Sequence, residues 1–296
     1  MSLSHRPAYM YTKRTAPIIR SVSVTIAVIW LEDGHQWCAA DTRLVAGKED
    51  DPVTEIGSKI FSISVSTSAI IPGAGTRAPH YSTEYGFVYA GSALPAVLTA
   101  ATASTLLSKL GSRGGRTSPP EFERMAELVH RLAKRFIIER RRFDGDGSFS
   151  AAFFGWCPHA EDYKVAHIEA SEDAGGPRVQ IYYPSKPQVD GEPWLVLGGA
   201  AATFQATFDA FVSSGSPITS RVPRSVIDKM VAENVDRTVG GSTSVGFAHQ
   251  HGFELLYTME PITPGTSDAR RTFNGLDLDT EIGEVFPYQV AMFGVA

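Results

Sequence analysis

Three polar residues of different types lie on neighbouring predicted strands near the start of the chain. Thr25 lies within the apolar stretch VSVTIAVIW, Asp41 follows in AADTRL, and Lys59 follows in GSKIF. A threonine hydroxyl is a weak nucleophile unless a base lies beside it, and cleavage before the threonine makes its own α-amine that base. The pattern therefore permits acyl transfer by Thr25. The same residue types are also common on the surfaces of sheets, so spacing alone leaves both interpretations open.

Each of the three residues has a task in such a mechanism. A free α-amine has a reference pKa of about 8. The ammonium group of Lys59 would lower that pKa by charge repulsion, and the carboxylate of Asp41 would hold the lysine as an ion pair. We therefore interpret Thr25 as a candidate nucleophile, with Lys59 and Asp41 as the residues that tune its base.

Two histidine-containing segments are candidate metal sites. Cys157 and His159, with His167 nearby, lack the paired ligand spacing of a zinc site and are more typical of a turn. His249 and His251 would share one face of a strand, but a solvated hairpin end explains them equally well. We therefore predict no metal site at either segment.

Other motifs give no support to further chemistry. The Gly-rich loop 111–120 is not followed by Gly-Lys-Ser/Thr, and the sequence contains no GxSxG motif, so neither a phosphate-binding loop nor an α/β-hydrolase nucleophile is indicated. The basic residues near the end of segment 121–142 are expected to form a solvated helix face, where cations complement the helix dipole.

Composition indicates an ordinary globular protein. The chain has 296 residues, of which 43% are hydrophobic and 20% charged, and its net charge is −5. This charge provides no overall attraction to nucleic acid or anionic lipid, and no apolar run is long enough for a membrane helix. Two cysteines cannot form a disulfide framework, and the first residues do not form a secretory signal. We therefore expect a cytoplasmic protein that binds neither nucleic acid nor membranes.

The order of predicted elements indicates an α+β fold. An opening β-hairpin, 22–44, and a strand at 59–65 are followed by helices at 92–111 and 121–142. Four further strands are predicted next, at 149–156, 163–170, 179–184 and 194–199. Two more helices follow, at 200–214 and 223–239, and the last predicted elements are strands at 244–250 and 252–259. Such segregation suggests helix pairs that cover β-sheets.

Several short motifs, in order, resemble the proteasome β-subunit family, including the bacterial HslV-type proteases, which are N-terminal-nucleophile hydrolases. TIAVIWLEDGHQWCAADTRL resembles the family's first hairpin, with its nucleophilic threonine and its Asp-x-Arg signature. The family's lysine strand is similar to GSKIF, and its AGS motif is similar to GFVYAGSALPAVLTA. The family's glycine turn is similar to LVLGGAAATFQATFDAF, and its Asp-x-x-Ser-Gly-Gly segment is similar to ENVDRTVGGSTSVGF. The resemblance extends from about Thr25 to Met259.

This resemblance implies a fold, a site and partners. It implies a four-layer αββα sandwich, with catalytic residues Thr25, Asp41 and Lys59, an oxyanion N–H at Gly91, and Asp236 on the family's aspartate. It also implies a homo-oligomeric ring that encloses the active sites, peptide or unfolded-protein substrates, an ATP-driven unfoldase as a partner, and no cofactor. Residues 1–24 would be a pro-segment or N-terminal extension, 25–260 the proteasome-like domain, and 261–296 a C-terminal extension.

The sequence also departs from the family pattern. Gly199 and Val239 replace two serines that normally help to hold the free amine and a water, although Thr238 or Ser242 could substitute. Val24 precedes Thr25 where self-processing subunits usually carry glycine. Ser23 is a second possible nucleophile, and residues 66–86 form an insertion.

Two functional hypotheses remain. The first is a threonine-type endopeptidase, active after removal of residues 1–24. The alternative is a catalytically inactive ring subunit with a scaffold or regulatory role, which the departures favour. A different acyl or amide hydrolase on the same fold is a third, weaker possibility, because a fold does not fix a substrate.

Overall fold

The predicted opening hairpin forms two inner strands of one sheet. The computed structural model describes residues 25–46, 51–70, 79–112, 118–143, 147–173, 176–214, 221–262, 268–285 and 288–295. Strands β1 (Ala27–Glu32) and β2 (His35–Asp41) pair antiparallel through a two-residue turn. Asp33 and Gly34 both have positive φ angles, 50° and 72°, as the favoured hairpin turns require.

The first large sheet has the strand order β11-β1-β2-β12-β13-β14-β15, with β18 beside β13. The strands that join the hairpin are β11 (Pro193–Leu197), β12 (Thr243–His249), β13 (Gly252–Pro261), β14 (Ala269–Phe273), β15 (Leu276–Asp277) and β18 (Gly294–Val295). Two separate small sheets pair β3 (Leu44–Ala46) with β4 (Asp51–Thr54), and β16 (Glu284–Val285) with β17 (Tyr288–Gln289).

The second large sheet has the order β10-β9-β8-β6-β5-β7. Its strands are β5 (Ile60–Ala69), β6 (Pro79–Gly91), β7 (Leu110–Ser112), β8 (Phe149–Cys157), β9 (Asp162–Asp173) and β10 (Gly176–Tyr182). The predicted insertion, 66–86, is seen in part: its described residues lengthen the β5–β6 hairpin. The antiparallel register runs from Ile60 opposite Val88 to Thr67 opposite Tyr81, and it shifts before Ser68, which is opposite Pro79. Residues 71–78 lie outside the described part.

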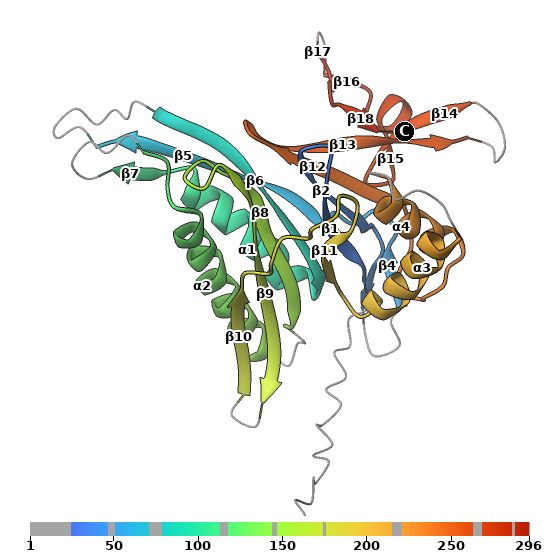
Figure 1. The fold of residues 1–296 in the computed structure, drawn as a ribbon, viewed down its shortest axis with the longest axis horizontal. Helices are drawn as coiled ribbons and strands as arrows, with labels where there is room; N and C mark the ends of the chain where they lie inside the picture. The colour runs from blue at the N-terminus through green and yellow to red at the C-terminus, as the bar shows by residue number, and fades with distance from the viewer. Residues whose placement is uncertain are drawn as a thin grey trace, which may run out of the picture.

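Two helix pairs lie at opposite sides of the sheets, as Figure 1 shows. Helices α1 (Ala93–Leu107) and α2 (Phe122–Arg141) pack on the second sheet, whereas α3 (Ala201–Ser213) and α4 (Val222–Ala232) pack on the first. A five-residue π-helix, η1 (Leu278–Ile282), follows β15. The predicted α+β class is confirmed.

Three clusters of buried side chains hold these parts together. One joins α1 and α2 to the second sheet, and another joins α3 and α4 to the first. The third contains residues of both sheets, among them Ile29 and Cys38 from the first and Val88 and Phe154 from the second. Phe154 meets Phe253 edge to face across this contact, with ring centroids 5.4 Å apart. The two sheets therefore pack against each other through apolar side chains.

Three details differ from the sequence-based expectations. The first helix ends at Leu107 rather than Gly111, because Leu110–Ser112 pairs with β5 as a parallel strand. The fourth helix ends at Ala232 rather than at 239, because Asn234 adopts a positive φ of 48° that a helix cannot contain. In α2, apolar residues at three- and four-residue intervals predict that Phe136 is part of the buried face, whereas Ile137 is buried and Phe136 is only partly covered.

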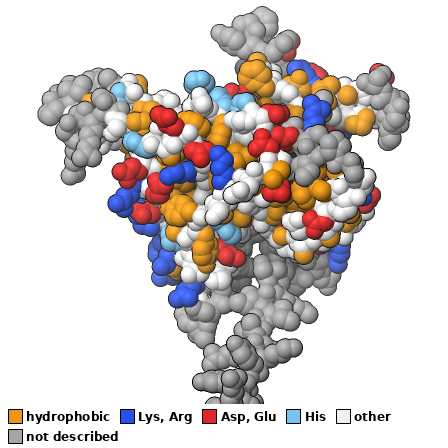
Figure 2. Space-filling view, viewed as in Figure 1, with side chains coloured by type: hydrophobic (Ala, Val, Ile, Leu, Met, Phe, Trp, Pro, Cys, Tyr) orange, Lys and Arg blue, Asp and Glu red, His pale blue; other side chains and the backbone are white. Residues whose placement is uncertain are grey.

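The charged surface over α2 mixes both signs, as predicted for a solvated face. Figure 2 shows basic side chains interspersed with acidic ones on the flank where Figure 1 places α1 and α2. Arg135 forms an ion pair with Glu139 at 3.1 Å, and Arg124 one with Glu127 at 3.2 Å. Among the described helices, none combines the length and the apolar character that crossing a membrane requires.

Truncation of Phe153 tests the core between α2 and the second sheet. Its ring is fully buried and stacks on Tyr85 and Phe122, with centroid distances of 5.1 and 5.4 Å. We expect Phe153→Ala to lower the free energy of unfolding by about 3–5 kcal/mol, since it removes contacts and leaves a cavity. Urea denaturation measures this. Phe143→Ala, at a ring that is 71% exposed, is the control, and an equal loss there would contradict the packing described.

Candidate active site

The structure brings together Thr25, Asp41 and Lys59. Asp41 Oδ1 accepts hydrogen bonds from Thr25 Oγ1 at 2.9 Å and from Lys59 Nζ at 2.7 Å. Lys59 Nζ also donates to Thr25 Oγ1. The β1–β2 hairpin places Thr25 beside Asp41, while Lys59 comes from the second sheet, directly before β5. Three residues that are distant in the sequence therefore share one polar cluster.

Burial makes this cluster chemically unusual. Asp41 and Lys59 are 0% and 1% exposed, and Thr25 is 4% exposed. Loss of water lowers the pKa of the Lys59 ammonium, and the attraction of Asp41 opposes that shift. A lysine with a lowered pKa releases its proton more readily than one in water, so proton movement between Lys59 and Thr25 becomes easier.

Main-chain N–H groups hold the Asp41 carboxylate from two further directions. Oδ1 accepts from the N–H of Ile26 at 3.1 Å, and Oδ2 accepts from the N–H of Gly240 at 3.2 Å. These bonds hold the Asp41 carboxylate in place at the centre of the cluster.

Asp236 has a position behind this cluster rather than in it. Its Oδ1 accepts from the N–H of Thr238 at 2.9 Å and from the Thr238 hydroxyl at 2.6 Å. These bonds close the turn that leads to Gly240, whose N–H reaches Asp41. Ser242 donates its hydroxyl to Glu260 at 2.6 Å. The hydroxyls of Thr238 and Ser242, considered as substitutes for the missing serines, thus bind these acidic side chains.

Arg43 is the arginine of the Asp-x-Arg signature in the first hairpin. The structure shows which groups it binds. Its Nε donates to both carboxylate oxygens of Glu55 at 3.0 Å, and its Nη1 donates to Asn234 Oδ1 at 3.0 Å and to the carbonyl of Arg237 at 2.8 Å. Arg43 therefore ties the end of the hairpin to the 234–240 turn. Sequence reasoning missed Glu55 and Asn234, because no local pattern links them to Arg43.

Two glycines lie close to Thr25 or to the cavity beside it. Gly198 has a φ of +101°, and a Cβ there would overlap the carbonyl oxygen of Thr25. Gly91 has a φ of +120°, and a Cβ there would lie 2.7 Å from the Cα of Phe149. Both glycines line a cavity of about 270 Å³ together with Gly199. The predicted oxyanion glycine, Gly91, thus lines the same cavity as Gly198, which touches Thr25.

The remaining predictions about the N-terminal region lie outside the described residues. These are the pro-segment 1–24, the residue Val24 and the alternative nucleophile Ser23. Part of the 261–296 extension is described: β14 and β18 both pair with β13 and so continue the first sheet. The division of the chain at 260 stays a prediction.

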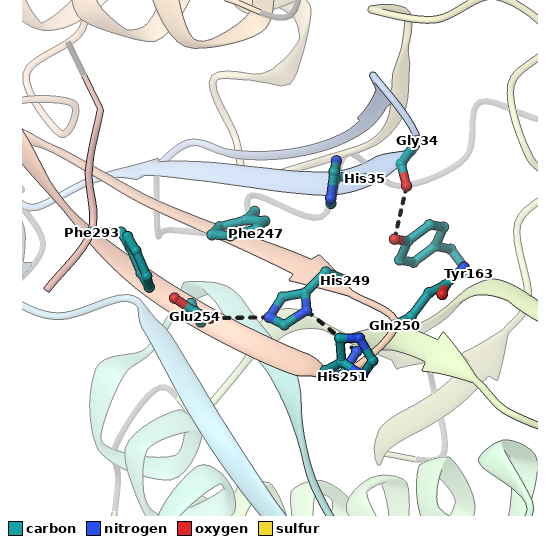
Figure 3. Close-up of a pocket in the computed structure, with 9 residues that line it drawn as sticks. All are labelled: Gly34, His35, Tyr163, Phe247, His249, Gln250, His251, Glu254 and Phe293. Atoms are coloured by element: carbon teal, nitrogen blue, oxygen red, sulfur yellow. Dashed lines mark hydrogen bonds and ion pairs between the residues drawn. The ribbon is translucent and has the colours of Figure 1, made fainter.

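The histidine-containing segments show no grouping typical of a metal site. Figure 3 shows His249 between Glu254 and His251 in a pocket that Phe247 and Phe293 also line. His249 Nε2 lies 3.1 Å from Glu254 Oε1. His159 bonds the carbonyl of Pro119 in a turn after the buried Cys157. Within the described part of the chain, no three His, Cys, Asp or Glu side chains cluster as metal ligands would.

Comparison of structures finds similar solved proteins. Anbu from Hyphomicrobium sp. strain MC1 matches with a TM-score of 0.48 and 16% identity, over 88% of this chain and 90% of that chain. Its Gly-1 mutant matches with a TM-score of 0.46 and 14% identity over the same shares. Anbu from Yersinia bercovieri, described as an ancestral β-subunit, matches with a TM-score of 0.49 and 13% identity, over 75% and 81%. No family model and no curated protein sequence matches.

These comparisons concern the fold. The chain is structurally similar to Anbu at low sequence identity.

Substitution of Gly198 tests its close approach to Thr25. Gly198→Ala adds a methyl group where the carbonyl of Thr25 lies, so we expect a clear drop in melting temperature. Gly176→Ala is a matched control, because Gly176 has a similar φ of +110° with nothing within 4 Å of its added Cβ. Both variants carry the strain of a positive φ, of order 1–3 kcal/mol. Equal melting temperatures for the two variants would contradict the contact.

Proposed function

We propose that this protein is a threonine-type N-terminal-nucleophile hydrolase, in which Thr25 attacks peptide bonds after removal of residues 1–24. The observation that carries the proposal is the buried contact of Lys59 with both the Thr25 hydroxyl and Asp41. We further propose that the sheets and helix pairs form the four-layer αββα sandwich of such hydrolases. The three buried clusters, one at each junction between layers, support this.

The proposed reaction uses each residue at a stated atom. Cleavage before Thr25 would free its α-amine, which takes the proton from Oγ1 as that oxygen attacks the carbonyl carbon of the substrate. Lys59 would keep the amine's pKa low, and Asp41 would hold Lys59 in place. The N–H of Gly91 would donate to the oxygen that becomes negative, and the amine would return its proton to the leaving nitrogen.

The cluster also explains why processing would be required. Thr25 is 4% exposed in the intact chain, and its nitrogen belongs to a peptide bond. An amide nitrogen is not a base, so the intact chain lacks the proposed proton acceptor. The alternative function, an inactive ring subunit, is favoured by Val239 and Gly199, which carry no hydroxyl. Whether the chain is processed therefore separates the two hypotheses.

The intact mass of the purified protein tests the proposal first. We expect a species that begins at Thr25 and hydrolyses unstructured peptides. Thr25→Ala should abolish peptide hydrolysis, because no other hydroxyl occupies its place, and Thr25→Ser should retain a part of it. Thr203→Ala, at an exposed hydroxyl in α3, is the control. Full activity of Thr25→Ala, or a chain that always retains residues 1–24, would reject the threonine hydrolase in favour of the scaffold.

We also propose that the chain assembles into a homo-oligomeric ring. Helix α1 exposes a group of apolar side chains, and such groups commonly mark contacts between proteins. They are Leu94, Val97, Leu98 and Leu106, which are 55%, 38%, 41% and 45% exposed. Peptide or unfolded-protein substrates and an ATP-driven unfoldase are the partners proposed for such a ring. A cytoplasmic location stays a prediction.

A charge on α1 tests the assembly. Leu98→Glu should reduce the oligomer to smaller species, because burial of an unpaired carboxylate in an interface is costly. Sedimentation velocity measures this, with Ala206→Glu on the exposed side of α3 as the control. A monomeric parent protein, or an unchanged oligomer in Leu98→Glu, would contradict the role of α1.

A further inference from the structure

A second hydroxyl lies within hydrogen-bond distance of a base, in the cavity beside the Thr25 cluster. Ser150 Oγ and His167 Nε2 are 2.7 Å apart. Both side chains line the cavity of about 270 Å³ to which Gly91 and Gly198 also contribute. A serine paired with a histidine at this distance is the arrangement that activates a serine for attack. The Thr25 mechanism uses neither residue.

The strand register explains how the two residues meet. In the β8–β9 pair, Ser150 is opposite Glu169 and Ala152 is opposite His167, so Ser150 and His167 are diagonal neighbours. Side chains alternate between the faces of a sheet. Ala152 belongs to the cluster between the two sheets, whereas Ala151 belongs to the cluster under the helices. Ser150 and His167 therefore face the space between the sheets.

The surroundings of His167 suit a base. Partial burial lowers the pKa of its imidazole, and the weaker attraction of the Glu169 carboxylate opposes this shift. A lowered pKa keeps the ring neutral near pH 7, which is the form that accepts a proton. The ring of Tyr182, opposite His167 in the β9–β10 pair, lies 6.0 Å from it, between ring centroids.

The opposite wall of the cavity can stabilise negative charge. Gly198 and Gly199 line the cavity and directly precede α3, a helix of 13 residues. The N-terminal end of a helix carries a partial positive charge and N–H groups without partners inside the helix. The N-cap residue of α3, Ala200, has no side chain that could accept from these groups. The site thus combines a nucleophile, a base and an electropositive wall.

We propose that Ser150 and His167 form a second acyl-transfer centre, which hydrolyses small carboxylic esters without the participation of Thr25. Ser150 Oγ attacks the ester carbonyl carbon while its proton moves to His167 Nε2. The C–O bond to the alcohol then breaks, and the alcohol leaves with the proton from His167. Water attacks the acyl-serine and gives a proton to His167, which returns it to Ser150 Oγ as the carboxylic acid departs.

The size and lining of the cavity define the substrate class. About 270 Å³ is slightly below the usual range for ligand pockets, about 300–1,000 Å³, so the acyl group must be short. Val196, Leu197 and Phe149 supply apolar lining, and the described lining contains no lysine or arginine. A short, uncharged acyl ester fits this lining better than a peptide or an anionic substrate. Because a serine–histidine pair needs no free α-amine, the intact chain is expected to carry this activity.

The test uses the full-length chain and a short-chain alkyl fluorophosphonate. Attack by Ser150 Oγ forms a P–O bond and releases fluoride, and His167 takes the proton. We expect the label on Ser150 within the tryptic peptide 143–164, located by fragment mass. It should be absent from Ser150→Ala, and His167→Gln should slow labelling about 100-fold or more, the usual contribution of a general base.

A matched variant separates Ser150 from its neighbour. Ser148→Ala removes another hydroxyl of the same cavity. It should be labelled on Ser150 at the parent rate and should hydrolyse p-nitrophenyl acetate as the parent does. An unlabelled Ser150 in the parent, a label only on Thr25, or an unchanged labelling rate in His167→Gln would overturn the proposal. Equal melting temperatures of parent and variants establish that folding is retained.

Discussion

The buried carboxylate of Asp41 is the constraint on which the arrangement around Thr25 depends. Four donors converge on it: the Thr25 hydroxyl, the Lys59 ammonium, and the N–H groups of Ile26 and Gly240. A buried charge without partners is strongly unfavourable, so each donor must be delivered to a fixed position. These donors come from the hairpin, from the segment before β5 and from the turn before β12. Both sheets must therefore be in place before the carboxylate is satisfied.

The packing of the sheets explains why glycine is required beside this cluster. Gly198 directly follows β11, an edge strand of the first sheet. It lies so close to the carbonyl of Thr25 that no side chain fits there. Gly91 is the last residue of β6 in the second sheet, and it lies close to the backbone of Ser148 and Phe149. Both glycines line the cavity of about 270 Å³ beside this cluster.

Sequence reasoning found the elements that carry local signals and missed those that depend on distant contacts. The opening hairpin at 22–44 and the helix at 121–142 were predicted well. The strand at Leu110–Ser112 was missed, because its partner in β5 lies far away in the sequence and the segment itself reads as the end of a helix. Thr25, Asp41 and Lys59 were found as residue types that suit one reaction. Ser150 and His167 were not paired, because only the β8–β9 register brings them together.

Gly199 lies between the two parts of the site. It follows Gly198, at which a Cβ would overlap the carbonyl of Thr25, and it lines the cavity of about 270 Å³ together with Ser150 and His167. The resemblance drawn from the motifs expects a serine at this position, and a glycine supplies no hydroxyl there. The hydroxyl of Ser150, in contrast, lies 2.7 Å from His167 Nε2 in the same cavity. The residue that weakens the case for Thr25 as a nucleophile therefore lies in the cavity where a second hydroxyl already has a base.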